Sequence, residues 1–192
     1  PDKNIRHIIH HYIRNAVLER GALNMKKRWI CLFVENETGV LARISGIFSG
    51  KSYNLDSLTV GITEDKTISR MTISLTSDDK TFEQIKKQLG RSVEVIKVVD
   101  FADIAVHMKE LMFVRVNHCS DREVDEIFKI SKTFHASVID YSPATVLIES
   151  IQTENRNNAL IFLLEKCYAN RIEIVRGGSV AIEALSIPKG TL

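Results

Sequence analysis

Hydrophobic residues in this chain alternate between short, nearly continuous runs and longer stretches in which they recur every three or four positions. The run at 29–35 is almost wholly apolar, which is typical of a strand buried on both faces. The next stretch, 39–50, predicts a helix that packs on a sheet through one face, formed by Val40, Leu41, Ile44, Ile47 and Phe48. The pattern then predicts strands at 53–62 and 67–76, a helix that begins after residues 77–79 and buries Phe82, Ile85 and Leu89, and a strand at 93–99.

The second half of the chain repeats this order of elements. Residues 111–117 resemble residues 30–36 at an offset of 81 positions, which indicates a duplicated strand and helix unit. The helix predicted at 121–134 buries Val124, Ile127, Phe128 and Ile130. The remaining elements are strands at 136–142 and 144–151, a helix at 154–167 that buries Leu160, Leu163 and Leu164, and a last strand at 171–176 that ends at Gly177 and Gly178.

The turn from Asn36 to Gly39, between the first strand and the first helix, is the best candidate for a binding site. A helix N-terminus carries unpaired N–H donors and partial positive charge, so it can bind a small carboxylate. Gly39 lets a ligand approach the backbone, and the amide of Asn36 can address either end of an amino acid. Asn and Gly also occur at such turns for purely structural reasons, so this alternative stays open. The equivalent turn after Asn117 continues His118-Cys119-Ser120 and lacks the glycine, so we place no amino-acid site there.

Composition and charge exclude several classes of protein. With 192 residues, 44% hydrophobic and 26% charged, the chain is ordinary globular material for one or two small domains. It contains no apolar run near the roughly 20 residues that cross a bilayer, and no secretory signal pattern, so we expect a soluble, cytoplasmic protein with no membrane partner. Seven basic residues against two acidic ones make residues 1–28 positive, and the rest of the chain is net negative, so we expect no nucleic-acid partner.

The first residues form a basic, amphipathic leader that we interpret as an extension of the domain. Pro1 is not an initiator residue, and residues 1–24 can be an upstream-translated or added segment. His7, His10 and His11 have helical spacing that could hold a metal ion, but no further ligands accompany them, so we expect no metal site.

No residue of this chain stands out as catalytic. The sequence has no phosphate-binding glycine loop, no zinc-protease motif and no nucleophile elbow. His107, His118 and His135 lie apart from plausible acid or nucleophile partners, so we interpret them as structural. Three cysteines embedded in apolar patterns are expected to be buried free thiols rather than disulfide or zinc ligands: Cys31, Cys119 and Cys167.

The segment 36–48, followed by 53–61, closely resembles an ACT domain, and more narrowly the family of small regulatory subunits of acetolactate synthase, also called acetohydroxyacid synthase. Residues 69–73 and 84–89 continue the likeness, which covers residues 27 to 187. The resemblance implies an α+β fold of two ferredoxin-like βαββαβ units in tandem, the first an ACT domain. The implied domains are an N-terminal extension at 1–26, the ACT domain at 27–102 and a C-terminal ferredoxin-like domain at 103–192.

The same resemblance implies a regulatory, non-catalytic role. The chain would bind the large catalytic subunit, raise its activity and confer feedback inhibition by a branched-chain amino acid, most simply valine. Thiamine diphosphate, magnesium and FAD would belong to that catalytic subunit, and this chain would carry no cofactor of its own. Homodimers would form through the ACT domains, with the effector sites at their seam.

The resemblance also assigns effector-binding residues on two segments. One side of the site would be formed by Asn36, Gly39, Val40 and Leu41, and the second by residues of the other subunit, Asn54 and Leu55. The chain departs from the family pattern just before Asn54. Ser52 stands where the family has glycine, so either the helix cap shifts to Gly50 or Asn54 is presented at a slightly altered angle, which bears on effector affinity more than on the fold. Thr38 stands where Pro or Ser is frequent in the family.

Two other functions keep the same fold. An ACT-type sensor of a different metabolic enzyme would have the same site with another amino acid as ligand. A nucleic-acid-binding ferredoxin-like protein would need exposed aromatic and basic residues on its sheet, which the net negative body argues against.

Overall fold

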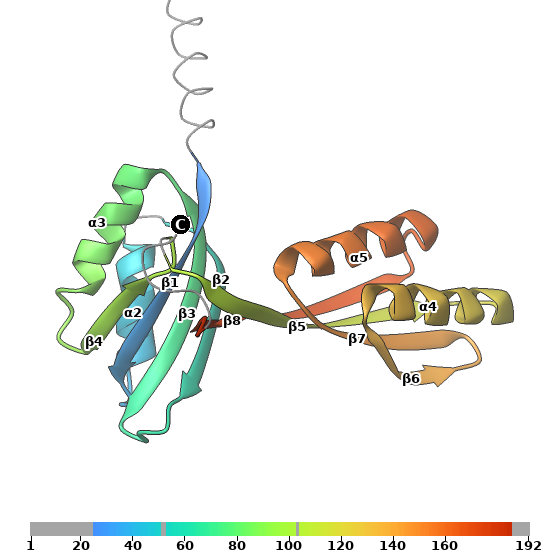
Figure 1. Ribbon diagram of the computed structural model, residues 1–192, viewed down its shortest axis with the longest axis horizontal. Helices are drawn as coiled ribbons and strands as arrows, with labels where there is room; N and C mark the ends of the chain where they lie inside the picture. Colours follow the sequence, from blue (N-terminus) through green and yellow to red (C-terminus); the bar gives the residue numbers. More distant parts are fainter. Residues whose placement is uncertain (1–24, 51–52, 103, 186–192) are drawn as a thin grey trace, which may run out of the picture. The chain divides into compact units, whose positions relative to one another are not determined.

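The structure is a computed structural model, and it describes residues 25–50, 53–102 and 104–185. It divides into two compact units, residues 1–103 and residues 104–192, which are described separately (Figure 1). The basic leader and the three histidines predicted within it lie outside the described residues, as does Ser52. Lys26, which we expected in the extension, is the first residue of the first strand.

The first unit has the predicted βαββαβ order. Its sheet has the strand order β2-β3-β1-β4, and all neighbouring strands are antiparallel. Both helices cover one face of this sheet (Figure 1). The elements are β1 (Lys26–Glu35), α2 (Val40–Ser49), β2 (Leu55–Ile62), β3 (Ile68–Ser77), α3 (Asp79–Leu89) and β4 (Val95–Asp100).

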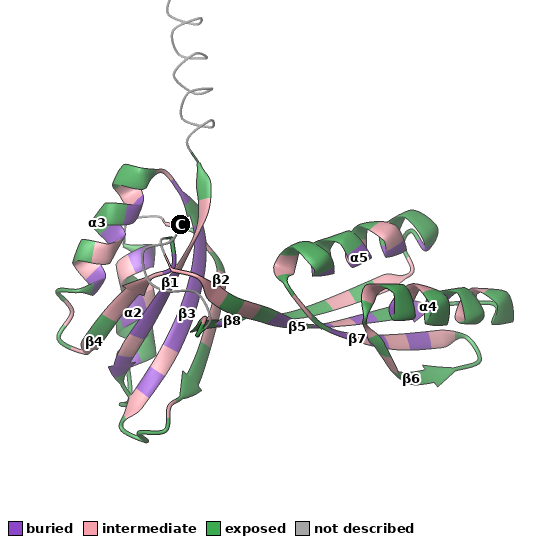
Figure 2. Ribbon diagram, viewed as in Figure 1, coloured by how far each residue is buried: buried purple, intermediate pink, exposed green. Residues whose placement is uncertain are grey.

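The core of the first unit lies between this sheet and its two helices, as the buried bands of Figure 2 show. Helix α2 contributes Val40, Ile44 and Phe48, which recur every four residues and are at most 2% exposed. Leu41, predicted to belong to the same face, is 46% exposed, so that prediction was wrong. A residue one step from Val40 lies about 100° further around the helix, and here that direction is open to solvent.

The second unit repeats the fold with the strand order β6-β7-β5-β8, again antiparallel throughout. Its core is formed mainly by alternate residues of β5 and β7 together with Ile127, Leu160 and Leu164 from the helices. The elements are β5 (Val106–Asn117), α4 (Asp121–Phe134), β6 (Ser137–Ser142), β7 (Thr145–Gln152), α5 (Glu154–Cys167) and β8 (Ile172–Glu183).

The last strand was predicted too short. Strand β8 does not end at Gly177 and Gly178 but continues to Glu183, and its partner β5 begins five residues earlier than predicted. The register between β5 and β8 shifts between Glu110 and Met112, and Gly178 there has a positive φ of 77°. The two glycines therefore form a bulge inside a continuous strand rather than its end.

Two predictions about buried residues were also wrong. Phe128 on α4 is 41% exposed, although Ile127 beside it is fully buried. Cys167 is exposed, whereas the other two cysteines are buried as predicted, and all three are free thiols. Within residues 25–50, 53–102 and 104–185 no helix has the length and apolarity needed to cross a membrane, and no group of metal-ligating side chains gathers.

Candidate effector site

The predicted binding turn joins the end of β1 to the start of α2. The backbone N–H of Asn36 donates to the carbonyl of Thr67 at 2.7 Å, which fixes the end of β1 beside β3. Gly39 then adopts a left-handed conformation, with φ of 87°, and α2 begins at Val40. No side chain caps this helix and its first turn holds no acidic residue. The N–H of Val40 donates to the carbonyl of Glu37 at 3.3 Å, which leaves the N–H groups of Leu41 and Ala42 for a ligand. The turn therefore has the polarity that suits a carboxylate.

The side chain of Asn36 also has a structural task. Its Nδ2 donates to the carbonyl of Lys66 at 2.9 Å, and its Oδ1 accepts a hydrogen bond from Ser69 Oγ at 2.9 Å. These bonds attach the binding turn to the loop between β2 and β3 and to the start of β3. One N–H and one lone pair of the amide remain for a ligand. The side chain is exposed, so that remaining capacity is accessible.

Arg43 is a residue of this site that sequence reasoning missed. Its Nη1 lies 3.2 Å from the position that a Cβ on Gly39 would occupy, and its guanidinium forms an ion pair with Glu94. The Ser92 hydroxyl, 2.6 Å from Glu94, and Arg43 both hold the pKa of this carboxyl below its usual range. A spacing of four residues from Gly39 is one helical turn, so the sequence did contain the signal. A carboxylate at the turn would meet this guanidinium as well as the helix N-terminus.

The other predicted residues divide between backbone and side-chain roles. Val40 is 2% exposed and its N–H donates to the carbonyl of Glu37, whereas the side chain of Leu41 is open beside the turn. Asn54 is exposed and Leu55 packs partly against the core of its own unit. Within one chain Asn54 lies at the far end of the sheet from the turn. The β3 residue that pairs with Leu55 is seven residues along the strand from the turn, a distance of about 23 Å. One chain thus brings four of the six predicted residues together.

Comparisons with known proteins agree with this architecture. The family model described as the AHAS small subunit-like ACT domain matches residues 30–97, and the model described as the small subunit of acetolactate synthase matches residues 109–185. The acetolactate synthase small subunit of Aquifex aeolicus is 41% identical over 158 residues, which cover 82% of this chain and 81% of that protein. This chain belongs to the acetolactate synthase small-subunit family.

Two further members of the family extend the likeness. The acetolactate synthase isozyme 3 small subunit of Escherichia coli is 34% identical over 156 residues, which cover 81% of this chain and 94% of that protein. The crystal structure of the acetolactate synthase small subunit from Thermotoga maritima superposes with a TM-score of 0.73 at 30% identity, and the match covers 84% of this chain and 99% of that one. The predicted tandem of ferredoxin-like units, the first an ACT domain, is confirmed.

The equivalent turn in the second unit of this family member is closed by its own side chains. Ser120 and Glu123 cap α4 reciprocally, with the Glu123 carboxylate 2.8 Å from the Ser120 N–H. Arg171 donates to Glu123 at 2.7 Å and to the carbonyl of His118 at 2.8 Å. The Arg171 bond and then the Ser120 bonds lower the pKa of Glu123 to about 2. An internal carboxylate therefore occupies the place that an effector carboxylate would take.

Proposed function

We propose that this chain is a regulatory subunit of acetolactate synthase, which binds the catalytic subunit, raises its activity and confers feedback inhibition by a branched-chain amino acid, valine first. The observation that supports effector binding is the uncapped N-terminus of α2 beside Asn36 and Arg43. The chain also belongs to a family whose members are small subunits of that enzyme. The chemistry, with thiamine diphosphate, magnesium and FAD, belongs to the catalytic subunit. We assign no catalytic residue to this chain.

Side-by-side pairing of two first units would complete the site. Strand β2 lies at the edge of its sheet, so an antiparallel pair of β2 strands around a two-fold axis places the start of one strand at the end of the other. The end of β2 is next to the binding turn, because Ile62 pairs with Ser69, which bonds Asn36. The second copy's Asn54 would therefore face the turn of the first copy. This arrangement supports a site at the seam of a homodimer.

The surroundings of the turn favour an amino acid with an apolar side chain. The α-carboxylate would bind the N–H groups of Leu41 and Ala42 in the first turn of α2 and the guanidinium of Arg43. The α-ammonium would bind the remaining lone pair of Asn36 Oδ1 and the second copy's Asn54. Leu41, 46% exposed at the same place, offers an apolar contact. Valine, leucine and isoleucine fit this description.

Inhibition requires that the effector bind one arrangement of the paired units better than another, because equal affinity for both would shift nothing. A ligand held between the turn of one copy and the β2 strand of the other depends on their relative position. Rotation or tightening at this seam is therefore the expected lever on the catalytic subunit.

Thermal unfolding with a panel of amino acids tests the proposal. Valine at about 100 times its dissociation constant should add about 2.7 kcal/mol and raise the midpoint by roughly 5–10 °C. Leu41→Glu should abolish this shift, because the new carboxylate repels the ligand, without loss of stability, because a negative charge suits a helix N-terminus. Ile96→Glu, at a residue 55% exposed on β4, is the matched control and should respond to valine normally.

The outcomes separate the candidate functions. Valine-selective stabilisation lost only in Leu41→Glu, with activation of the catalytic subunit retained, supports the proposal. Stabilisation by an unrelated amino acid favours an ACT-type sensor of a different enzyme. If no amino acid stabilises the chain and none inhibits the enzyme reconstituted with its catalytic subunit, the effector site does not exist.

A further inference from the structure

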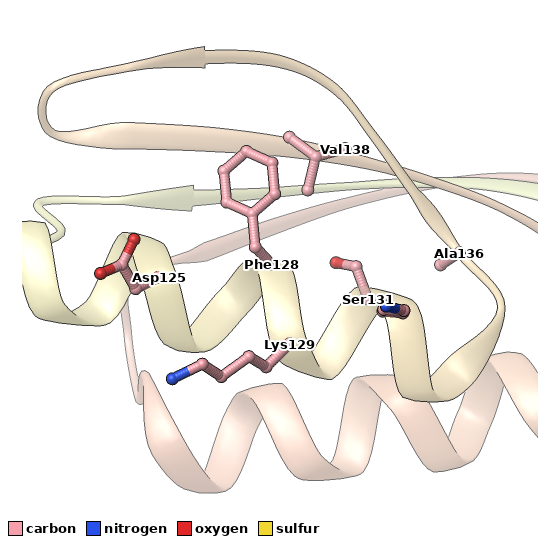
Figure 3. A pocket seen from close by; sticks show the side chains of 7 residues that line it. Asp125, Phe128, Lys129, Ser131, Ala136 and Val138 are labelled. Atoms are coloured by element: carbon pink, nitrogen blue, oxygen red, sulfur yellow. The ribbon is translucent and has the colours of Figure 1, made fainter.

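A cleft in the second unit lies between α4 and the edge strand β6, and the proposed function leaves it without a role. Figure 3 shows Phe128 and Ser131 projecting from α4 toward the chain that enters β6. The cleft has a volume of about 510 Å³ and its floor is apolar on the strand side. It is lined by Asp125, Phe128, Lys129, Ser131, Lys132, Ala136 and Val138.

Two features of this cleft are unusual at the surface of a folded protein. Ser131 is 2% exposed, and its hydroxyl has no hydrogen-bond partner among the residues that the structure describes. A buried hydroxyl without a partner is destabilising, and most such groups in folded proteins are paired. The aromatic ring of Phe128 remains 41% exposed beside it. Both features would be resolved by a side chain that brings an apolar ring and a hydroxyl.

The strand that borders the cleft is itself unpaired on one side. Strand β6 pairs with β7 alone among the described strands, which leaves a row of backbone groups open. Val138 and Tyr141 of β6 are opposite the buried residues Ile148 and Val146, so both side chains point to the helix side of the sheet. Tyr141 is 64% exposed and meets Phe128 edge to face, with ring centroids 5.6 Å apart.

We propose that a second copy of this chain docks in this cleft, through antiparallel pairing of the two β6 strands around a two-fold axis. When the axis lies between Ile139 and Asp140, Val138 of one copy is opposite Tyr141 of the other. Each copy's Tyr141 then enters the cleft of the other over Val138 and Phe128, and its hydroxyl meets Ser131. The chain thus carries both the cleft and the side chain that fills it.

The charges on α4 complement each other under the same symmetry. Helix α4 packs over β6 and β7, so the two-fold axis sets the α4 helices of the two copies side by side and antiparallel. Asp125 of one copy then lies opposite Lys132 of the other, and each interface contains this pair twice. Among the described residues neither Asp125 nor Lys132 forms an ion pair within its own chain. This proposal is independent of the effector site, which belongs to the first unit.

Cysteine cross-linking in the full-length chain tests this contact. In a Cys167→Ser background, which removes the exposed native thiol, Asp140→Cys places a thiol next to the proposed axis. A short bismaleimide should join two such chains rapidly at micromolar protein. Val175→Cys, at a β8 residue 56% exposed, is the control and should cross-link slowly.

Second-site variants in the Asp140→Cys chain identify the groups that hold the contact. Tyr141→Lys should slow cross-linking about tenfold or more, as expected for loss of a buried aromatic anchor. Phe162→Lys removes an aromatic residue of α5 with nearly the same exposure, 65%, and should have no effect. Asp125→Lys should slow the cross-linking reaction, and the double variant Asp125→Lys/Lys132→Asp should restore its rate. Such a recovery would show that the single variant had not simply unfolded.

Three results would overturn the proposal. These are a β6 cysteine that reacts no faster than the β8 control, a rate unaffected by Tyr141→Lys, and a charge swap that fails to restore the rate. If, in addition, Tyr141→Lys weakens binding of the catalytic subunit while self cross-linking is absent, that subunit occupies the cleft instead. Loss of the valine response in a chain that still cross-links through β6 would count only against the proposed effector function.

Discussion

Replacing Gly39 by alanine tests the backbone geometry on which the proposed effector site depends. Gly39 has a φ of 87°, and a residue with a Cβ loses about 1–2 kcal/mol in this left-handed region. The new Cβ would lie 3.2 Å from Arg43 Nη1, at the end of a flexible side chain that can move. Its movement would weaken the pair with Glu94, which adds little to stability because Arg43 is 51% exposed. We therefore expect Gly39→Ala to lower the free energy of unfolding by about 1–2 kcal/mol, the cost of the left-handed backbone.

The same helix offers a matched control. Gly46 lies inside α2, and a Cβ there would meet no atom within 4 Å. Alanine in an open helical position is more favourable than glycine by about 0.5–1 kcal/mol, so Gly46→Ala should stabilise the unit. The two glycines lie about 10 Å apart along one helix, at about 1.5 Å per residue. The same chemical change should therefore lower the stability of the unit at one position and raise it at the other.

Urea denaturation followed by tryptophan fluorescence reports this unit specifically. Trp29 is the only tryptophan of the chain and lies in β1 of the first unit. The midpoint of Gly39→Ala should fall by roughly 1 M urea relative to the wild type, and that of Gly46→Ala should rise. Equal midpoints for the two variants would refute the left-handed turn. Valine binding should weaken in Gly39→Ala alone.

Three further predictions concern the rest of the chain. Arg176→Met removes the guanidinium that donates two hydrogen bonds to the Glu110 carboxylate, which is only 4% exposed. The free energy of unfolding, measured by urea denaturation followed by circular dichroism, should fall by about 3 kcal/mol. Glu110→Met in the same chain should recover most of that loss. The pKa of Glu123 is lowered to about 2 in the folded chain, so its ion pair and cap stabilise the fold near neutral pH. Glu123→Gln should therefore lower the unfolding midpoint at neutral pH. The difference in midpoint between this variant and the wild type should shrink as the pH falls from 4.5 toward 2. A maleimide reagent should label Cys167 in the native chain long before the two buried thiols, whose pKa values burial raises, Cys31 and Cys119.

The order of elements could be predicted because each element has a clear period and clear ends. The helices predicted at 121–134 and 154–167 coincide with α4 and α5. Ser120 and Thr153 stand immediately before them, and polar residues of this type favour helix starts. The strands were placed within one or two residues wherever a turn bounded them.

Features set by pairing between distant strands could not be predicted in the same way. Gly177 and Gly178 look like the end of a strand, and only the register against β5 shows that they form a bulge. Phe128 has helical spacing with buried neighbours, yet the edge position of β6 leaves it half open. Asn36 was expected to be free for a ligand, but its amide is shared with Lys66 and Ser69, more than 29 residues away. Sequence spacing carries no information on such contacts.

The two units have the same fold, but the N-termini of their first helices differ. Both place a strand, a turn and a helix N-terminus in the same order, so both begin with unpaired N–H donors. In the second unit the Ser120 hydroxyl accepts from the Glu123 N–H, and the Glu123 carboxylate accepts from the Ser120 N–H and supplies the negative charge. Arg171 donates to that carboxylate and holds it in place. In the first unit the corresponding helix has neither a capping side chain nor an acidic residue in its first turn. An external carboxylate gains most at a helix N-terminus that no side chain caps, which is why we propose the effector site in the first unit and not in the second.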